Sequence, residues 1–189
     1  MSNKNVTVIG AGSFGTALAM VLEQAGNKVQ IWAREEEIAN RINEDHINPS
    51  YLNDIQLSED IVAYNNIEQC LQSQDIVVFA TPSHALREVA KKIKPCLDGH
   101  EILVTVAKGI ENDTFMTMSQ VLIEVMDGTT YEDNIGVLYG PSHAEEVGKL
   151  RPTTVVAAAY STRTAKIIQE TFLTPMFRVY VNNDVIGVE

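Results

Sequence analysis

Eight short runs rich in β-branched and aliphatic residues recur along the chain, and segments with the apolar spacing of a helix lie between them. The runs are residues 5–9, 28–32, 61–64, 75–80, 101–106, 134–138, 153–159 and 177–181. The helical spacing is clearest in residues 16–25 and 115–126, and the second segment places Phe115, Met118 and Leu122 on one stripe. This alternation of strand and helix predicts an α/β fold.

Several of these runs are apolar without alternation, as in residues 76–79. Strands of this kind are typical of a parallel sheet that helices cover on both faces, so we expect a doubly wound, mostly parallel, Rossmann-like sheet. Because no Pro-, Gly- or Ser-rich linker divides the chain, we expect one domain over residues 1–189. At the end of the chain Asn183 or Asp184 could cap a helix that has scarcely begun, so we expect a longer chain to have been cut there.

The charge balance limits the partners that the chain can attract. It has 14 lysines and arginines against 25 aspartates and glutamates, a formal net charge of −11. This field repels nucleic-acid phosphates and anionic lipid, so we expect neither nucleic acid nor a membrane as a partner. A small anionic ligand stays open, because a few local cations and backbone amides can outweigh a diffuse field.

Cysteine and histidine usage bears on compartment and metal content. Cys70 and Cys96 form no CxxC motif, and two free thiols suit a reducing compartment. The polar N-terminal residues contain no signal-peptide core, and no apolar run reaches the about 18 residues that span a bilayer. We therefore expect a cytoplasmic protein. The four histidines lack the spacing of metal ligands, so no metal site is expected.

A GAGSFG motif, from Gly10 to Gly15, directly follows the first predicted strand and opens the first predicted helix. In this setting Gly10 permits a tight turn, Gly12 lets the backbone approach a pyrophosphate, and Gly15 lets the helix pack close to the sheet. Ser13 and Phe14 begin the helix, whose free amides would face the anion. The alternative is a glycine-rich turn without a nucleotide, but strand, turn and helix in this order favour a dinucleotide.

The residue that follows the second predicted strand bears on the choice between NAD and NADP. An acidic residue there would bond the adenine ribose hydroxyls of NAD, whereas the guanidinium of Arg34, which stands near that position, suits a 2′-phosphate. NADP(H) is therefore the favoured cofactor. NAD(H) stays open if one of residues 35–37, all glutamates, turns in, and a solvated Arg34 without a ligand is the structural alternative.

Ligands of doubly wound sheets bind beyond the carboxyl ends of the strands, where three further loops, at residues 81–84, 107–109 and 140–144, carry polar residues. Lys108 follows one predicted strand, and Gly140 and Ser142 follow the next, at the mouth of a helix. A lysine that ends a buried strand is unusual unless it is paired or functional, although its ammonium can also snorkel to the rim. No GxSxG motif is present, so acyl-transfer chemistry is not expected.

Six short motifs together resemble one family, the NAD(P)-dependent glycerol-3-phosphate dehydrogenases of the bacterial type. They are GAGSFGTA at 10–17, WAR at 32–34, HINPSYL at 46–52, ATPS at 80–83, AKGIE at 107–111 and GPSHA at 140–144. The resemblance implies reduction of dihydroxyacetone phosphate to sn-glycerol 3-phosphate, the backbone for phospholipid synthesis, with hydride from NADPH or NADH. Each motif alone is weak evidence, whereas the set in family order is specific.

The resemblance also implies roles for individual residues. Lys108 would stabilise the negative charge that builds on the substrate carbonyl during hydride transfer, and it would touch both cofactor and substrate. The implied cofactor contacts are Ser13, Phe14, Arg34, Lys108 and Ala144, and the implied substrate contacts are Lys108, Gly140 and Ser142.

The chain departs from the family at its end. Family members continue into a helical second domain whose early helix carries the lysine that acts as general acid/base, so the resemblance places that lysine beyond Glu189, outside these residues. It therefore implies a cofactor-binding domain that is inactive alone, and it leaves open a homodimer of the full-length protein. Two other readings stay open: a non-catalytic dinucleotide sensor, which would not need Lys108, and a dehydrogenase of the hydroxyacid or ketopantoate type, which would not need residues 140–144.

Overall fold

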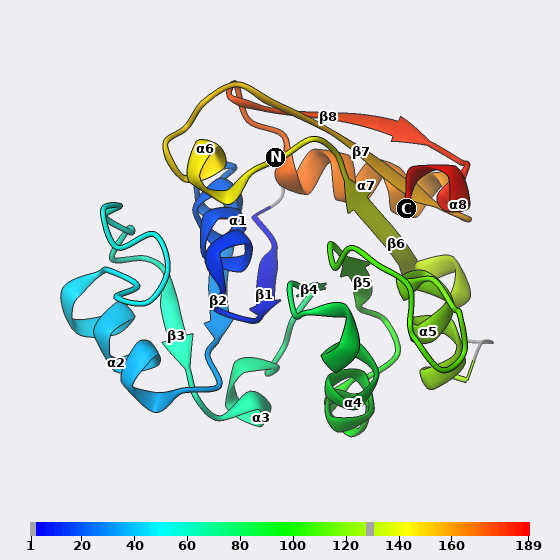
Figure 1. Cartoon of the computed structure of the whole chain (residues 1–189), viewed down its shortest axis with the longest axis horizontal. Coiled ribbons are helices and arrows are strands. Elements are labelled where there is room, and N and C mark those ends of the chain that lie inside the picture. Colours follow the sequence, from blue (N-terminus) through cyan, green and yellow to red (C-terminus); the bar gives the residue numbers. More distant parts are fainter. Residues whose placement is uncertain (1–2, 128–130) are drawn as a thin grey trace.

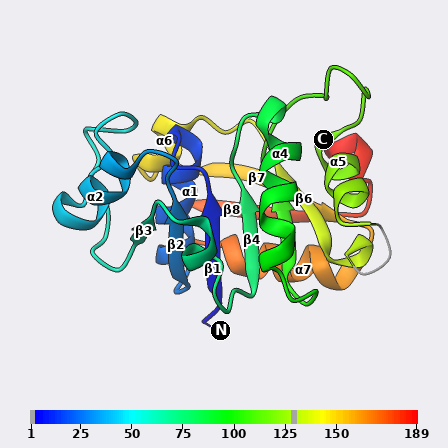
Figure 2. The ribbon, with the colours of Figure 1, turned by 90° about the horizontal axis from the view of Figure 1, so that it is seen from below.

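The computed structural model describes residues 3–127 and 131–189, which place one eight-stranded sheet between helices (Figures 1 and 2). The strands are β1 (Asn5–Ile9), β2 (Lys28–Trp32), β3 (Val62–Tyr64), β4 (Ile76–Phe79), β5 (Ile102–Thr105), β6 (Ile135–Tyr139), β7 (Thr153–Ala159) and β8 (Phe177–Asn182). The α-helices are α1 (Ser13–Gln24), α2 (Glu36–Asp45), α3 (Ile67–Cys70), α4 (Ser83–Ile93), α5 (Met118–Val125), α6 (Ala144–Gly148), α7 (Thr162–Phe172) and α8 (Val185–Val188), with short 3₁₀ turns at Lys94–Cys96 and Glu132–Asn134.

The strand order is β3-β2-β1-β4-β5-β6-β7-β8, and every neighbouring pair is parallel except β6 and β7. The chain proceeds outward from β1 through β2 to β3, then crosses back to β4 on the other side of β1. The order therefore reverses between β1 and β4. In open α/β sheets this switch point leaves a crevice beyond the carboxyl ends of the two strands, where ligands bind.

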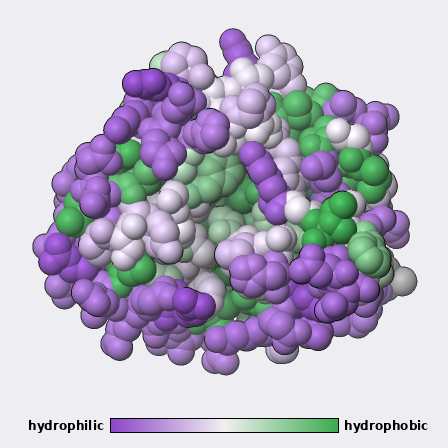
Figure 3. All heavy atoms as spheres, in the orientation of Figure 1, coloured by the Kyte–Doolittle hydropathy of each residue, from purple (hydrophilic) through white to green (hydrophobic). Residues whose placement is uncertain are grey.

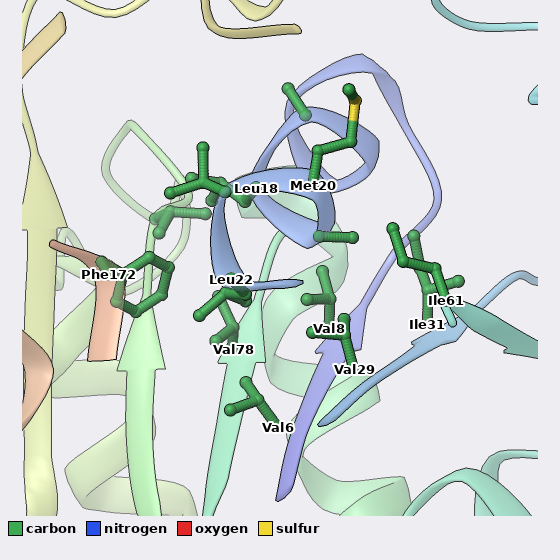
Figure 4. Close-up of a cluster of buried hydrophobic side chains, with 14 of the residues drawn as sticks. Val6, Val8, Leu18, Met20, Leu22, Val29, Ile31, Ile61, Val78 and Phe172 are labelled. Atoms are coloured by element: carbon green, nitrogen blue, oxygen red, sulfur yellow. The ribbon is translucent and has the colours of Figure 1, made fainter. Parts of the chain in front are cut away.

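Two apolar layers hold the helices against the sheet. On one face, α1, α2, α6 and α7 cover one buried cluster, and Figure 4 shows side chains of α1 such as Leu18 and Leu22 facing Val6 and Val8 of β1 and Val78 of β4. On the other face, α3, α4 and α5 cover a second cluster that includes Phe79. Because both faces are covered, the central strands β4 and β5 are buried along their whole length, as their unbroken apolar sequences predict.

The predicted strands agree closely with the observed ones. Residues 5–9, 28–32 and 153–159 match β1, β2 and β7 at both ends, and the other five differ by one residue at one or both ends. Asp184 caps α8, as predicted for one of two candidates, because its carboxylate accepts a hydrogen bond from the Gly187 amide at 2.9 Å. Among the described residues, no helix is both long and apolar enough to cross a bilayer.

The predicted helical stripe that begins at Phe115 is wrong at its start. Thr117 and Gln120 form a capping box, so α5 begins only at Met118. Phe115 precedes this cap with a φ of 57°, and 80% of its surface is exposed. The apolar spacing holds for Met118 and Leu122, but a capping box cannot be seen from apolar spacing alone.

Candidate functional site

The GAGSFG motif forms the turn between β1 and α1, at the switch point of the sheet. Gly10 has a φ of +117°, and a Cβ there would lie 2.8 Å from the carbonyl oxygen of Ala80. A Cβ on Gly15 would lie 2.0 Å from the carbonyl oxygen of Gly10 and 3.1 Å from the Cβ of Ala80. Both positions therefore require glycine, one for its backbone conformation and both for close packing.

Gly12 differs from the other two glycines because the space beside it is open. It is the N-cap of α1 with a φ of −75°, and nothing lies within 4 Å of the position of its Cβ. No side chain caps this end of the 12-residue helix, and its first turn contains no acidic residue. The free amides and the positive end of the helix dipole thus suit an anion in the space beside Gly12.

Two adjoining cavities flank this turn. The space-filling view shows a hollow with neutral and hydrophobic residues near the middle of the face that is seen in Figure 1 (Figure 3). The larger, of about 440 Å³, is lined by residues that include Gly12, Ser13, Phe14, Lys108, Ser142 and Ala144. The smaller, of about 230 Å³, is lined by residues that include Gly10, Gly12, Trp32 and Arg34. Tyr51 and Thr81 line both cavities. All the predicted cofactor residues except Gly15 therefore line at least one of the two adjoining cavities.

Arg34 lies at the outer end of the smaller cavity, just beyond β2. Its side chain is 81% exposed, and its Nε and Nη2 donate hydrogen bonds to Glu35 Oε1 at 2.9 and 2.7 Å. The acidic run after β2 thus holds the guanidinium through Glu35. An exposed pair of this kind contributes little stability, so an anionic ligand can displace Glu35 at low cost.

Lys108, Gly140 and Ser142 meet at the opposite end. Lys108 Nζ donates to the Gly140 carbonyl oxygen at 3.2 Å, and the amide and hydroxyl of Ser142 donate to the same oxygen at 2.9 and 3.4 Å. A Cβ on Gly140 would lie 2.7 Å from the carbonyl oxygen of Thr154, so glycine is needed there for packing against β7. Lys108 is exposed, so the burial argument for its function does not apply. Its ammonium stands at the rim of the larger cavity as a solvated cation.

Glu189, beyond which the resemblance places the general acid/base lysine, lines neither cavity. Its carboxylate accepts hydrogen bonds from the Ser119 amide at 2.9 Å and from the hydroxyls of Thr117 and Ser119 at 2.8 and 2.5 Å. These donors stand at the start of α5, where a negative charge also suits the helix dipole. Glu189 therefore holds the end of α8 against the start of α5. The place of the general acid/base lysine stays a prediction.

Two contacts hold the segment that carries Lys108. Tyr139 Oη donates a hydrogen bond to the Ala107 carbonyl oxygen at 2.5 Å, and burial raises the pKa of this hydroxyl above its ordinary value. Arg87 of α4 binds both carboxylate oxygens of Glu111 at 2.8 Å, and it also reaches Glu124 of α5 at 3.0 Å. The segment that follows β5 is thus fixed to β6, α4 and α5.

The Arg87–Glu111 pair predicts a pH-dependent stability. Hydrogen bonds from Arg87 lower the pKa of Glu111 from 4.5 to about 2, so its contribution is present above pH 4.5 and is lost as the pH falls toward 2. We expect Glu111→Gln to lower the free energy of unfolding at pH 7 by about 1–2 kcal/mol, with the difference from wild type shrinking on acidification. Urea unfolding at a series of pH values measures this. Glu88→Gln, which removes an exposed pair with Lys91, is the control, and a Glu111→Gln difference that did not change with pH would contradict the assignment.

Sequence reasoning named neither Tyr51 nor Thr81 as a binding residue, although it singled out the loop that begins at Thr81 and both residues stand in motifs that the resemblance used. The Thr81 hydroxyl oxygen is buried without a hydrogen-bond partner among the described residues, and the residue is only 7% exposed. An unpartnered buried hydroxyl beside two cavities is the kind of group that a ligand satisfies. The free amides of α1, the open space at Gly12 and this hydroxyl together fit a dinucleotide.

One group of potential metal ligands lies away from these cavities. Side-chain atoms of Asp98, His100 and Glu101 lie within 4.8 Å of one another, just before β5. Both carboxylate oxygens of Glu101 are already occupied, Oε1 by the Asp98 amide and Oε2 by the Gly99 amide and the Tyr131 hydroxyl. The buried carboxylate is therefore explained by structural hydrogen bonds.

Comparison with known proteins connects the site to one family. Residues 5–165 match the family model for the NAD-dependent glycerol-3-phosphate dehydrogenase N-terminus. A glycerol-3-phosphate dehydrogenase [NAD(P)+] of Salinibacter ruber is 46% identical over 185 residues, which are 98% of this chain and 54% of the relative. A similarly named protein of Staphylococcus epidermidis is 44% identical over 98% of this chain and 56% of the relative.

Solved structures give the same result at the level of the fold. The crystal structure of glycerol-3-phosphate dehydrogenase from Coxiella burnetii superposes with a TM-score of 0.90 at 31% identity, over 99% of this chain and 56% of that chain. The chain thus spans about half the length of the relatives that it matches. Because the family model covers most of the described residues, the chain belongs to the NAD-dependent glycerol-3-phosphate dehydrogenase family and corresponds to its N-terminal part.

Proposed function

We propose that residues 1–189 form a domain that binds NADP(H), and more weakly NAD(H), for the reduction of dihydroxyacetone phosphate to glycerol 3-phosphate. The observation that carries the proposal is the uncapped end of α1 at the switch point, with a free space beside Gly12 and a cation at each end of the adjoining cavities. An elongated ligand with a central pyrophosphate and anionic or reactive groups at both ends fits this order.

The two ends of the site have different tasks in this proposal. Gly12, Ser13 and Phe14 bind the pyrophosphate from the start of α1, and Arg34 binds the 2′-phosphate of the adenine ribose. Ala144 lines the nicotinamide end, where the bound cofactor supplies the hydride. Lys108, Gly140 and Ser142 hold the substrate, and the Lys108 ammonium stabilises the negative charge that develops on the carbonyl oxygen.

Titration of the chain with NADPH and NADH tests this proposal directly. The sequence has a single tryptophan, Trp32, which lines the smaller cavity and is 8% exposed. Bound reduced dinucleotide should therefore quench Trp32 emission and show energy transfer to the nicotinamide. No saturable signal with either dinucleotide, in calorimetry as well as fluorescence, would refute the proposal.

Arg34 should select NADPH over NADH. A charge-assisted contact with the 2′-phosphate is worth about 1.5–3 kcal/mol. We therefore expect Arg34→Ala to weaken the binding of NADPH at least tenfold and the binding of NADH less than twofold. Glu35→Gln should strengthen NADPH, because Glu35 then no longer competes for the guanidinium. Arg41→Ala, which breaks an exposed pair with Asp45, is the control. If Arg34→Ala weakened the binding of NADPH and NADH equally, Arg34 would not bind the 2′-phosphate.

The same proposal includes the substrates, the compartment and the assembly of the protein. Its small-molecule partners are dihydroxyacetone phosphate and glycerol 3-phosphate, and its compartment is the cytoplasm, which suits the two free cysteines. A homodimer is the proposed assembly of a protein with the full length of the relatives.

A further inference from the structure

The side chain of Asn48 connects two segments of the site that are distant in the sequence. It is fully buried, and its Nδ2 donates to the Ala11 carbonyl oxygen at 2.8 Å and to Thr16 Oγ1 at 2.9 Å. Its Oδ1 accepts from the amides of Ser50 and Tyr51, both at 3.2 Å. Both donors and the acceptor of the amide are thus in use. One end holds the glycine turn, and the other holds the loop that carries Tyr51.

The loop between α2 and β3 is also fixed on its other sides. The Leu57 amide donates to the His46 carbonyl oxygen at 2.8 Å and closes the loop. Further along, Ile55 packs so close to α6 that a Cβ on Gly148 would lie 2.6 Å from its Cδ1. The loop therefore contacts both the glycine turn and α6, and its residue Tyr51 lines both cavities.

We propose that Asn48 is a positioning residue for dinucleotide binding. Its side-chain amide fixes the Ala11 carbonyl, and hence the turn that presents the amides at the start of α1, and it holds the backbone of Tyr51, a residue that lines both cavities. Asn48 itself does not line either cavity, so it acts through these neighbours. The inference rests on the proposed binding of NAD(P)(H), and it assigns the α2–β3 loop to the binding site as a pre-formed wall.

The physical reason lies in the cost of disordering a binding turn. A buried carbonyl or amide without a hydrogen-bond partner costs free energy. Removal of the Asn48 side-chain amide should therefore let the turn and the loop shift apart to positions where these groups are hydrogen-bonded. A turn that samples several positions must be ordered when the pyrophosphate binds, and that ordering weakens affinity. Because the pyrophosphate is common to both dinucleotides, the loss should be equal for NADPH and NADH, unlike the loss from Arg34→Ala.

The test measures dinucleotide Kd in variants that break the contact from either side. We expect Asn48→Ala to weaken NADPH and NADH about five- to tenfold each, at a temperature where thermal melting shows the variant to be folded. Thr16→Val removes one acceptor of the amide with little change of shape, and it should weaken both two- to fivefold. Thr16→Ser keeps the hydroxyl and should restore wild-type affinity. Thr16→Val also serves if Asn48→Ala does not fold.

Asn43→Ala is the matched control. Asn43 makes a similar pair of amide contacts with the backbone of Ala63, at 2.9 and 2.7 Å, in the same region but outside both cavities. Its loss should lower the melting temperature without changing either Kd. In a double-mutant cycle with Tyr51→Ala, the effect of Asn48→Ala should shrink, because one of the residues that it seats is gone.

The outcomes separate this inference from the proposal on which it rests. If the wild-type chain binds neither dinucleotide, the proposed function fails. If the wild type binds both but folded Asn48→Ala and Thr16→Val keep wild-type Kd values, Asn48 has only a structural role and the inference is overturned. Effects of Asn48→Ala and Tyr51→Ala that simply multiply would overturn the seating of Tyr51.

Discussion

Gly12→Val is expected to weaken the binding of NADPH and NADH at least a hundredfold while leaving the domain folded. Nothing lies within 4 Å of the position of the Gly12 Cβ, and the φ of −75° is open to any residue, so the valine meets no protein atom at its Cβ. It would instead project beside the uncapped amides of α1, where the pyrophosphate is proposed to bind. Loss of two charge-assisted hydrogen bonds, each about 1.5–3 kcal/mol, gives at least this factor.

Gly15→Ala separates loss of binding from loss of folding. Its Cβ would lie 2.0 Å from the Gly10 carbonyl oxygen, so this variant should lower the melting temperature strongly. Gly12→Val should melt close to wild type, yet give no saturable signal in calorimetry. If Gly12→Val bound either dinucleotide as tightly as wild type, the pyrophosphate would have to lie elsewhere, and the proposed site would be wrong.

The fold could be predicted from the sequence because burial on both faces leaves a direct mark. A strand such as β4, with four consecutive buried apolar residues, lacks the alternation of a half-exposed strand. The separate apolar runs along the sequence then give the number of strands. The antiparallel pairing of β6 and β7 cannot be predicted in this way, because β6 is as completely buried as its parallel neighbour β5. The start of α5 depends on the hydrogen bonds of Thr117 with Gln120, which override the apolar spacing.

The candidate site divides in the same way between local and distant contacts. The positive φ of Gly10 and the close approach of Gly15 to the Gly10 carbonyl belong to a turn whose parts are adjacent in the sequence, so a motif can predict them, whereas their packing against Ala80 is a distant contact. Asn48 contacts residues 32 and 37 positions away in the sequence, so only the folded structure shows that it connects the loop to the glycine turn. Glu189 likewise reaches residues 70 and 72 positions away, a contact that no local pattern predicts. The strand-end argument for Lys108 was misleading, since the chain leaves the buried layer before that residue.

The 189-residue chain is expected to bind the cofactor but to reduce dihydroxyacetone phosphate about 10²–10⁴ times more slowly than a protein with the full length of its relatives. Apart from hydroxyl-bearing serine and threonine, the described side chains of the larger cavity that can donate a proton are Tyr51, Lys108 and His143, and all three are exposed. A positioned general acid contributes about 10²–10⁴ to a rate, and exposed groups are poorly positioned for that role. Exclusion of water from the reacting groups adds a further factor.

The comparison uses NADPH absorbance in the presence of dihydroxyacetone phosphate. One sample is this chain, and the other is a chimera in which it is followed by the C-terminal half of the 46% identical Salinibacter ruber relative. Equal Kd values for NADPH in both samples would show that the site is intact in each. Robust turnover by the short chain would contradict the expectation, and Lys108→Met, His143→Gln and Tyr51→Phe would then identify the donor. A folded, NADPH-binding chimera without turnover would instead contradict the proposed reaction and leave the proposed binding site in place. Hydride transfer requires the residues around Lys108 to stabilise a transition state, whereas cofactor binding does not.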